Sequence, residues 1–210
     1  MIKVLIADDH NVVRQGLKNI IDQQSDMKVS GEAASAHELL EKVRKQPWDV
    51  VILDVTMPGK SGLDALKELK IEKPKLPVLI LSMHPEDQYA TRVLKAGASG
   101  YMTKETAGEE LVQAIRKVVN GGKYISPSLA EKLAFHLEAP TDKDPHEMLS
   151  DREYQVLCMI ASGKTVNEIG KMLSLSVKTV STYRARILEK MNLKNNAALI
   201  HYALHNKLVH

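Results

Sequence analysis

The chain has 210 residues and a formal net charge of +3, with 44% hydrophobic and 26% charged residues. These values are typical of a soluble globular protein with one large or two small domains, and they exclude a chain that is strongly basic throughout. Cys158 is the only cysteine, so no internal disulfide can form, which fits a reducing compartment. The chain opens on an apolar strand, IKVLIA, without a signal peptide and without a run long enough to span a bilayer. The sequence therefore predicts a cytoplasmic protein that does not enter a membrane.

The charge is unevenly distributed along the chain. Residues 1–137 carry 19 Lys and Arg against 18 Asp and Glu, whereas residues 146–210 carry 9 against 5. A modest basic excess in a small C-terminal unit favours a nucleic-acid partner.

Short β-branched runs alternate with amphipathic helical patterns through the first 120 residues. The expected strands are Lys3–Ala7, Lys28–Ala33, Val50–Leu53, Val78–Leu81 and Gly100–Met102, and the expected helices lie near 12–23, 36–45, 62–70, 86–96 and 106–119. Five such units with nearly continuous apolar strands predict a doubly wound parallel α/β sheet. Ligands of such sheets bind outside the carboxyl ends of the strands.

A change of pattern follows this first unit. One short helical pattern covers Ser126–Leu137, and the segment EAPTDKDPHE at 138–147 has the prolines and charges of a linker. Only helical signals come after it. Capping boxes are predicted at Ser150 with Glu153 and at Thr165 with Glu168. Two further helices are expected from Ser176 to about Met191 and over Ala197–Leu204.

Carboxylates gather at the ends of two expected strands. Asp8 and Asp9 follow the first strand and Asp54 ends the third, and these strands can be neighbours in a doubly wound sheet. Like charges at that range repel each other, and a hard divalent cation such as Mg²⁺ relieves the repulsion. Ser82 ends the fourth strand and Lys104 follows the fifth, on the same edge. Each residue alone is more often a turn or cap, but their combination on the ligand-binding edge indicates a site.

Residues 1–120 resemble the receiver domain of bacterial two-component response regulators, a flavodoxin-like fold. The segments that carry the resemblance are VLIADDH, VVILDVTMPGKSGLDAL, PVLILS and AGASGYMTKE. The resemblance implies that Asp54 accepts a phosphoryl group from the phosphorylated histidine of a sensor kinase. It implies that Asp9, Asp54 and the carbonyl of Thr56 hold Mg²⁺, with Asp8 acting through water. Lys104 would pair with the phosphoryl group, and Ser82 and Tyr101 would form the switch pair.

An enzyme of another class also places an Asp after an apolar strand. Phosphatases of the haloacid dehalogenase type carry D-x-D-x-[TV], but Thr56 stands here where the second Asp, the general acid, is needed. We therefore expect that the protein is not an enzyme, and that its only reactions are the self-phosphorylation and autodephosphorylation of a phosphoryl acceptor.

The C-terminal segment resembles the four-helix DNA-binding domain of the LuxR/NarL class. The resemblance rests on LSDREYQVL, GKTVNEIGKML, LSVKTVSTYRARILEKM and AALIHYAL, and a receiver followed by this domain is the arrangement of NarL/FixJ-type regulators. The expected third helix has an apolar face with a polar face broadly opposite, which can enter a major groove. The family match implies base-edge contacts from Ser181, Thr182 and Ala185. Phosphate contacts are expected from Lys178, Thr179, Arg186 and Lys190.

The sequence thus predicts a receiver at 1–122, a short helix and linker at 123–149, and a helix-turn-helix domain at 150–210. Phosphorylation would favour dimerisation or release of the DNA-binding domain, so that a homodimer binds double-stranded DNA. A sensor histidine kinase and RNA polymerase are the expected protein partners. The alternative is a regulator whose DNA binding is independent of phosphorylation, with the receiver as a dimerisation module.

Overall fold

The computed structural model describes residues 1–83, 86–127, 129–131, 144–206 and 208–209. The chain divides into two compact units, Met1–His136 and Leu137–His210, and each is treated by itself. Residue 128 and residues 132–143 lie outside the described residues, and they include most of the predicted linker at 138–147 and about half of the predicted helix at 126–137.

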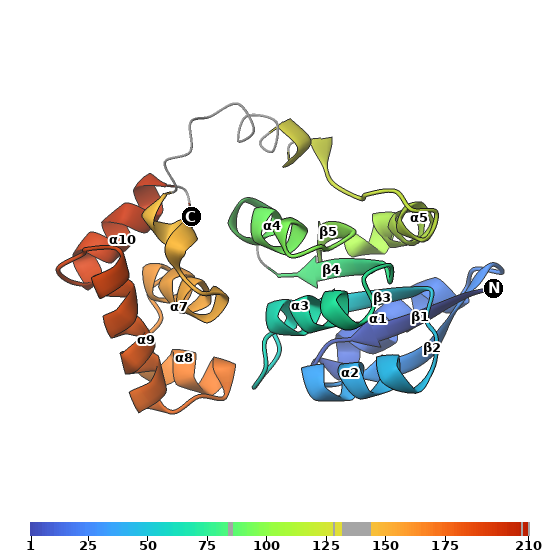
Figure 1. Ribbon diagram of the computed structural model, residues 1–210, viewed down its shortest axis with the longest axis horizontal. Helices are drawn as coiled ribbons and strands as arrows, with labels where there is room; N and C mark the ends of the chain where they lie inside the picture. The colour runs from blue at the N-terminus through green and yellow to red at the C-terminus, as the bar shows by residue number, and fades with distance from the viewer. Residues whose placement is uncertain (84–85, 128, 132–143, 207, 210) are drawn as a thin grey trace. The chain divides into compact units, whose positions relative to one another are not determined.

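The first unit contains a five-stranded parallel sheet, which confirms the predicted fold (Figure 1). The strand order is β2-β1-β3-β4-β5, so β1 and β3 are neighbours, with Ala7 paired to Leu53. All residues of β3 and β4 are buried, which explains why these strands read as unbroken apolar runs. The strands are β1 (Ile2–Ala7), β2 (Met27–Ala33), β3 (Val50–Asp54), β4 (Val78–Ser82) and β5 (Gly100–Thr103).

Helices cover both faces of this sheet (Figure 1). They are α1 (Asn11–Asp22), α2 (Ala36–Lys45), α3 (Gly62–Glu72), α4 (Glu86–Lys95) and α5 (Ala107–Val119). α1 contacts α5, and α2 contacts α3. Alternate residues of the strands, including Val4, Ile6 and Ile52, form one buried cluster with Leu17 and Leu111 from α1 and α5. Successive residues of a strand point to opposite faces of the sheet, so every second residue contributes to this cluster.

The second unit is helical throughout its described part. A short 3₁₀ helix, η1 (Pro145–Met148), precedes α7 (Asp151–Ala161), α8 (Val166–Leu173), α9 (Val177–Lys190) and α10 (Asn196–His205). Both predicted capping boxes are confirmed, at Ser150 with Glu153 and at Thr165 with Glu168. They satisfy backbone N–H groups that would otherwise lack partners at the helix starts, and so fix where α7 and α8 begin.

The turn between α8 and α9 has a tight backbone. Ser174 ends α8 in the left-handed region at φ 54°, and the amide of Leu175 donates to the carbonyl of Gly170 at 2.8 Å. A Cβ at Gly170 would lie 2.8 Å from the Leu175 carbonyl oxygen, so glycine permits this close approach. Ser176 then caps α9 by accepting a hydrogen bond from the amide of Thr179.

Candidate functional site

The strand order brings two buried carboxylates together at the carboxyl edge of the sheet. Asp8 directly follows β1, Asp54 is the last residue of β3, and these strands pair in parallel. The two residues are 1% and 2% exposed. A carboxylate pair this deeply buried is unfavourable unless a cation or hydrogen-bond donors compensate it.

Lys104 supplies that compensation from the loop after β5. Its Nζ lies 2.7 Å from Oδ2 of Asp54 and 2.6 Å from Oδ2 of Asp8, and its side chain is 9% exposed. The backbone amide of Lys104 donates to the carbonyl of Ser82 at 2.8 Å, which fixes the loop against the end of β4. Three strands and one loop thus converge on a single buried ion-pair cluster.

Burial controls the protonation of this cluster. Loss of solvent raises the pKa of Asp54 to about 6, and the nearby Asp8 adds to this effect, while Lys104 and the amide of Thr56 oppose it. Burial lowers the pKa of Lys104, but the carboxylates of Asp54 and Asp8 outweigh it and raise that pKa above its usual range. Asp54 is therefore ionised at neutral pH and keeps a charged lysine beside it.

The loop after β3 holds the Asp54 carboxylate in place. The amide of Thr56 donates to Oδ1 of Asp54 at 2.8 Å, and the amide of Gly62 donates to the carbonyl of Val55 at 3.0 Å. A Cβ at Gly62 would lie 2.0 Å from the carbonyl oxygen of Asp54, so only glycine fits there. Ser61 caps α3 through a hydrogen bond from the amide of Asp64. The GKSG sequence thus folds the loop tightly back beneath Asp54.

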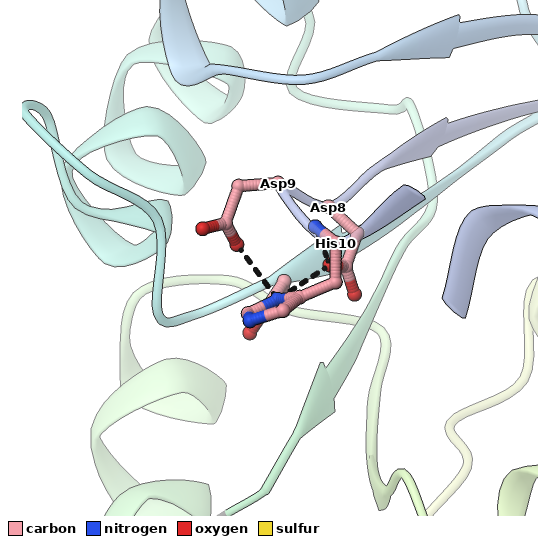
Figure 2. Close-up of side chains that lie close together, drawn as sticks. Asp8, Asp9 and His10 are labelled. Atoms are coloured by element: carbon pink, nitrogen blue, oxygen red, sulfur yellow. Dashed lines mark hydrogen bonds and ion pairs between the residues drawn. The ribbon is translucent and has the colours of Figure 1, made fainter. Parts of the chain in front are cut away.

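An imidazole adjoins the acidic pair. From sequence, His10 could either line the pocket or start a helix, and its side chain makes no capping hydrogen bond to α1. Figure 2 shows Nδ1 of His10 pointing at both aspartates, 3.2 Å from Oδ1 of Asp8 and 3.0 Å from Oδ1 of Asp9. The backbone amide of His10 also donates to Oδ1 of Asp8 at 2.8 Å. The adjacency of His10 to Asp9 in sequence was the available signal, but adjacency alone does not show where a ring points.

The donors in this pocket suit a hard divalent cation. Asp8, Asp9, His10 and Asp54 each offer a ligand atom, and these atoms lie within 4.8 Å of one another. Within the described part of the chain, Oδ2 of Asp8 and Oδ1 of Asp9 are buried and accept no hydrogen bond, although Lys104 and His10 lie at ion-pair distance. Buried carboxylate oxygens with spare acceptor capacity are the ligands that Mg²⁺ prefers. The pocket is therefore compatible with Mg²⁺.

The two expected switch residues lie on neighbouring strands. Ser82 ends β4 and Tyr101 is the second residue of β5, and both are fully buried. β4 and β5 pair in parallel, with Ser82 opposite Thr103. Tyr101 thus has its ring inside the protein in this structure.

Most of the expected DNA-contacting side chains lie on one exposed surface of α9. Lys178, Ser181, Thr182, Ala185 and Arg186 are exposed, while Thr179 is partly buried. Val180 and Ile187 are fully buried, and Met191 is 6% exposed. The helix therefore packs its apolar side and leaves its small polar side free, as the periodicity predicted.

Two basic residues of α9 have protein partners that sequence periodicity did not reveal. Nζ of Lys190 lies 2.6 Å from Oε2 of Glu153, the capping residue of α7. Nε of Arg184 donates to Oδ1 of Asn196 at 2.6 Å, which joins α9 to α10. A phosphate contact by Lys190 would therefore compete with an existing ion pair.

Two family comparisons match most of the chain. Residues 4–116 match the family described as "Response regulator receiver domain", and residues 147–203 match "Bacterial regulatory proteins, luxR family". The receiver match decides against the phosphatase alternative. In the described part of the chain, none of the helices has the length and apolar character that a membrane span requires.

Relatives are similar over their whole length. The response regulator GacA of Pseudomonas aeruginosa is 41% identical over 210 residues, which cover 100% of this chain and 98% of that protein. UvrY of Escherichia coli is 37% identical, over 99% of this chain and 96% of that protein.

Solved structures are similar over both units as well. RcsB of Salmonella typhimurium superposes with a TM-score of 0.63 at 29% identity, covering 97% of this chain and 100% of that one. RcsB in a complex with DNA superposes with a TM-score of 0.60 at 29% identity, covering 100% of this chain and 99% of that one. The chain therefore belongs to the response regulators of the NarL/FixJ type, in which a receiver domain is followed by a LuxR-family DNA-binding domain.

Proposed function

We propose that this protein is a cytoplasmic transcriptional regulator that a sensor histidine kinase activates by phosphorylating Asp54. The observation that carries the proposal is Nζ of Lys104, which lies 2.7 Å from Asp54 and 2.6 Å from Asp8 in a chain that also holds an exposed recognition helix. The proposed domain limits are 1–122, 123–149 and 150–210. Apart from self-phosphorylation and autodephosphorylation, we propose no enzymatic turnover.

The proposed reaction moves a phosphoryl group from nitrogen to oxygen. A carboxylate oxygen of Asp54 attacks the phosphorus of the kinase phosphohistidine, and the N–P bond breaks as the O–P bond forms. The electron pair of the broken bond returns to the imidazole nitrogen of the kinase. Because the pKa of Asp54 is about 6, the nucleophile is ionised at neutral pH.

The charge that develops on the phosphoryl oxygens needs stabilisation from this pocket. Lys104 already lies 2.7 Å from Asp54, so its Nζ can turn from the carboxylate to a phosphoryl oxygen. Asp8, Asp9, Asp54 and the carbonyl of Thr56 would hold Mg²⁺, with Asp8 acting through water. When bound, Mg²⁺ supplies charge neutralisation for the transfer.

The proposed switch uses Ser82 and Tyr101. The phosphoryl group adds acceptor oxygens to which the Ser82 hydroxyl can donate, at the end of the strand next to β3. Because the Tyr101 ring is already buried, we propose that phosphorylation stabilises this inward position. Phosphorylation then shifts the equilibrium between the inward and outward positions of Tyr101, by as much as the phosphoryl group interacts more favourably with the inward one.

The proposed output is DNA binding by a dimer, with RNA polymerase as a further partner. RcsB, the structural relative, has been solved on promoter rprA in the presence of the phosphomimetic BeF₃⁻. We propose base-edge contacts for Ser181, Thr182 and Ala185. Lys178, Thr179, Arg186 and Lys190 are the proposed phosphate contacts.

The phosphate assignment predicts a change in salt dependence. Lys178→Ala with Arg186→Ala should weaken binding to all DNA sequences and make the slope of log K against log salt shallower by about 2, since each lost phosphate contact removes about 0.9. Fluorescence anisotropy over a salt series measures this slope. The control is Lys73→Ala with Lys75→Ala, which removes equal charge from exposed positions of the receiver. An unchanged slope in the α9 variant would refute the assignment.

The alternative function is DNA binding that does not depend on phosphorylation. It requires that DNA affinity be the same for wild type, for wild type treated with acetyl phosphate and Mg²⁺, and for Asp54→Ala. The buried Asp54–Lys104 pair argues against it, because a receiver serving only for dimerisation does not need charged groups in its interior.

A further inference from the structure

The chain returns to the edge of the sheet after α5 and pairs with the strand that carries Tyr101. Tyr124 forms a parallel bridge with Gly100, in which its amide donates to the carbonyl of Ser99 at 2.9 Å. The amide of Tyr101 in turn donates to the carbonyl of Tyr124 at 3.1 Å. Residue 124 thus covers the outer edge of β5 at the position of the proposed switch residue.

Several contacts hold Tyr124 in this pairing. Its hydroxyl donates to Glu110 on α5, and Nζ of Lys117 lies 5.9 Å from the centre of its ring. Nζ of Lys123 donates to the carbonyl of Ala98 at 2.5 Å. The pairing is therefore anchored by side chains as well as by backbone hydrogen bonds.

Gly100 makes the close approach possible. A Cβ at this position would lie 2.6 Å from the carbonyl oxygen of Tyr124 and 2.8 Å from its Cβ. Any other residue in this place would push the returning segment away from β5.

The paired segment leads directly into the connection between the two units. Two residues after Tyr124, Ser126 caps a helical turn by accepting a hydrogen bond from the amide of Leu129 at 3.1 Å. Leu129 is 2% exposed, so this turn is also fixed by burial. Between α5 and Tyr124 the chain turns through Gly121, at φ 84°, and Gly122, whose amides donate to the carbonyls of Val118 and Lys117 at 3.1 and 3.0 Å. The returning segment is therefore tied to α5 as far as Gly122 and to β5 at Tyr124.

We infer that Tyr124 is a positioning residue that transmits the state of the Tyr101 strand to the interdomain connection. This inference rests on the proposed function. Tyr101 carries both the switch side chain and the amide that binds Tyr124, so a shift of β5 moves the start of the connection with it. The hydrogen-bonded pair gives the two sites a shared element that phosphorylation can bias.

The test compares two substitutions of Tyr124. Tyr124→Pro removes the amide that donates to Ser99, whereas Tyr124→Phe keeps the backbone pairing and loses only the hydroxyl. Each protein is treated with acetyl phosphate and Mg²⁺, its phosphoryl adduct is measured by intact mass, and its affinity is measured for a pool of random-sequence DNA duplexes. We expect equal adduct in all three proteins, and a gain in affinity upon phosphorylation that Tyr124→Pro reduces at least about fivefold and Tyr124→Phe retains.

Hydrogen exchange of residues 126–131 provides a second readout in the same samples, and Gly100→Ala disrupts the pairing from the β5 side. Phosphorylation should change the exchange of these residues in wild type and not in Gly100→Ala. This variant also tests the inference if Tyr124→Pro does not fold. The inference about Tyr124 would be overturned if Gly100→Ala, or a folded Tyr124→Pro, kept both the full gain in DNA affinity and the change in hydrogen exchange upon phosphorylation. The proposed function would not be affected by that result. A wild type that forms no adduct would instead overturn the proposed function, and this inference with it.

Discussion

Replacing Lys104 by Met should destabilise the receiver by about 3–5 kcal/mol at pH 8, because it leaves the buried carboxylates of Asp8 and Asp54 without their cation. The loss should shrink as the pH falls, and it should begin to do so above pH 6, because Lys104 lowers the pKa of Asp54 in wild type and its removal raises that pKa further. Urea unfolding followed by Trp48 fluorescence measures this loss, since Trp48 is the only tryptophan and lies in the first unit.

A matched control separates this effect from loss of any paired lysine. Lys18 lies 3.5 Å from Glu32, but its side chain is 39% exposed, so Lys18→Met should change the free energy of unfolding by about 1 kcal/mol or less. Addition of Mg²⁺ should restore part of the stability of Lys104→Met by neutralising the same carboxylates. A Lys104→Met protein as stable as wild type at pH 8 would contradict the ion-pair geometry.

Replacing Asp54 by Asn should stabilise the receiver at pH 8 in the presence of a chelator. Burial raises the folded-state pKa of Asp54 to about 6 from a reference value of 3.8, so the folded state holds the proton more tightly than the unfolded state. The stability that this group contributes is complete below pH 3.8 and is lost as the pH rises through about 6. The difference corresponds to about 3 kcal/mol at 1.36 kcal/mol per pKa unit.

Urea titrations of wild type and Asp54→Asn at pH 4, 6 and 8 with EDTA would measure this difference. We expect nearly equal stabilities at pH 4, an advantage for the variant that develops mostly between pH 4 and pH 6, and little further change up to pH 8. A second variant, Asp26→Asn, should show the opposite trend and lose stability relative to wild type as the pH rises, because the hydrogen bond from Arg116 lowers the pKa of Asp26. If Asp54→Asn gained no stability relative to wild type between pH 4 and pH 8, the pKa of Asp54 would not be raised in the folded protein.

The sheet and the acidic pocket could be predicted because both depend on local sequence and topology. Short apolar runs rich in β-branched residues, such as Val50–Leu53, favour buried strands, and parallel strands place their carboxyl ends at one edge. Asp8, Asp54 and Lys104 therefore converge although they are far apart in the chain. The capping boxes of α7 and α8 were predictable for the same reason, since each involves only four consecutive residues.

Other contacts could not be predicted because they depend on how distant elements pack. Lys190 reads as an exposed phosphate contact by helical period, yet it reaches Glu153 across 37 positions of the chain. The edge pairing of Tyr124 lies in the short segment GGKYIS, which is too brief for a strand pattern. Periodicity tells which face of an element is buried, whereas the partner of a polar side chain is set by the neighbouring elements.

The most direct test of the account is the intact mass of wild type and Asp54→Ala after incubation with acetyl phosphate and Mg²⁺, with the oligomeric state measured on the same samples. We expect one phosphoryl adduct on wild type that requires both Asp54 and Mg²⁺ and that shifts monomer to dimer. Wild type without an adduct, or an adduct that persists in Asp54→Ala, would contradict the assignment of Asp54 as the phosphoacceptor. The first of these results would leave phosphorylation-independent DNA binding as the better description.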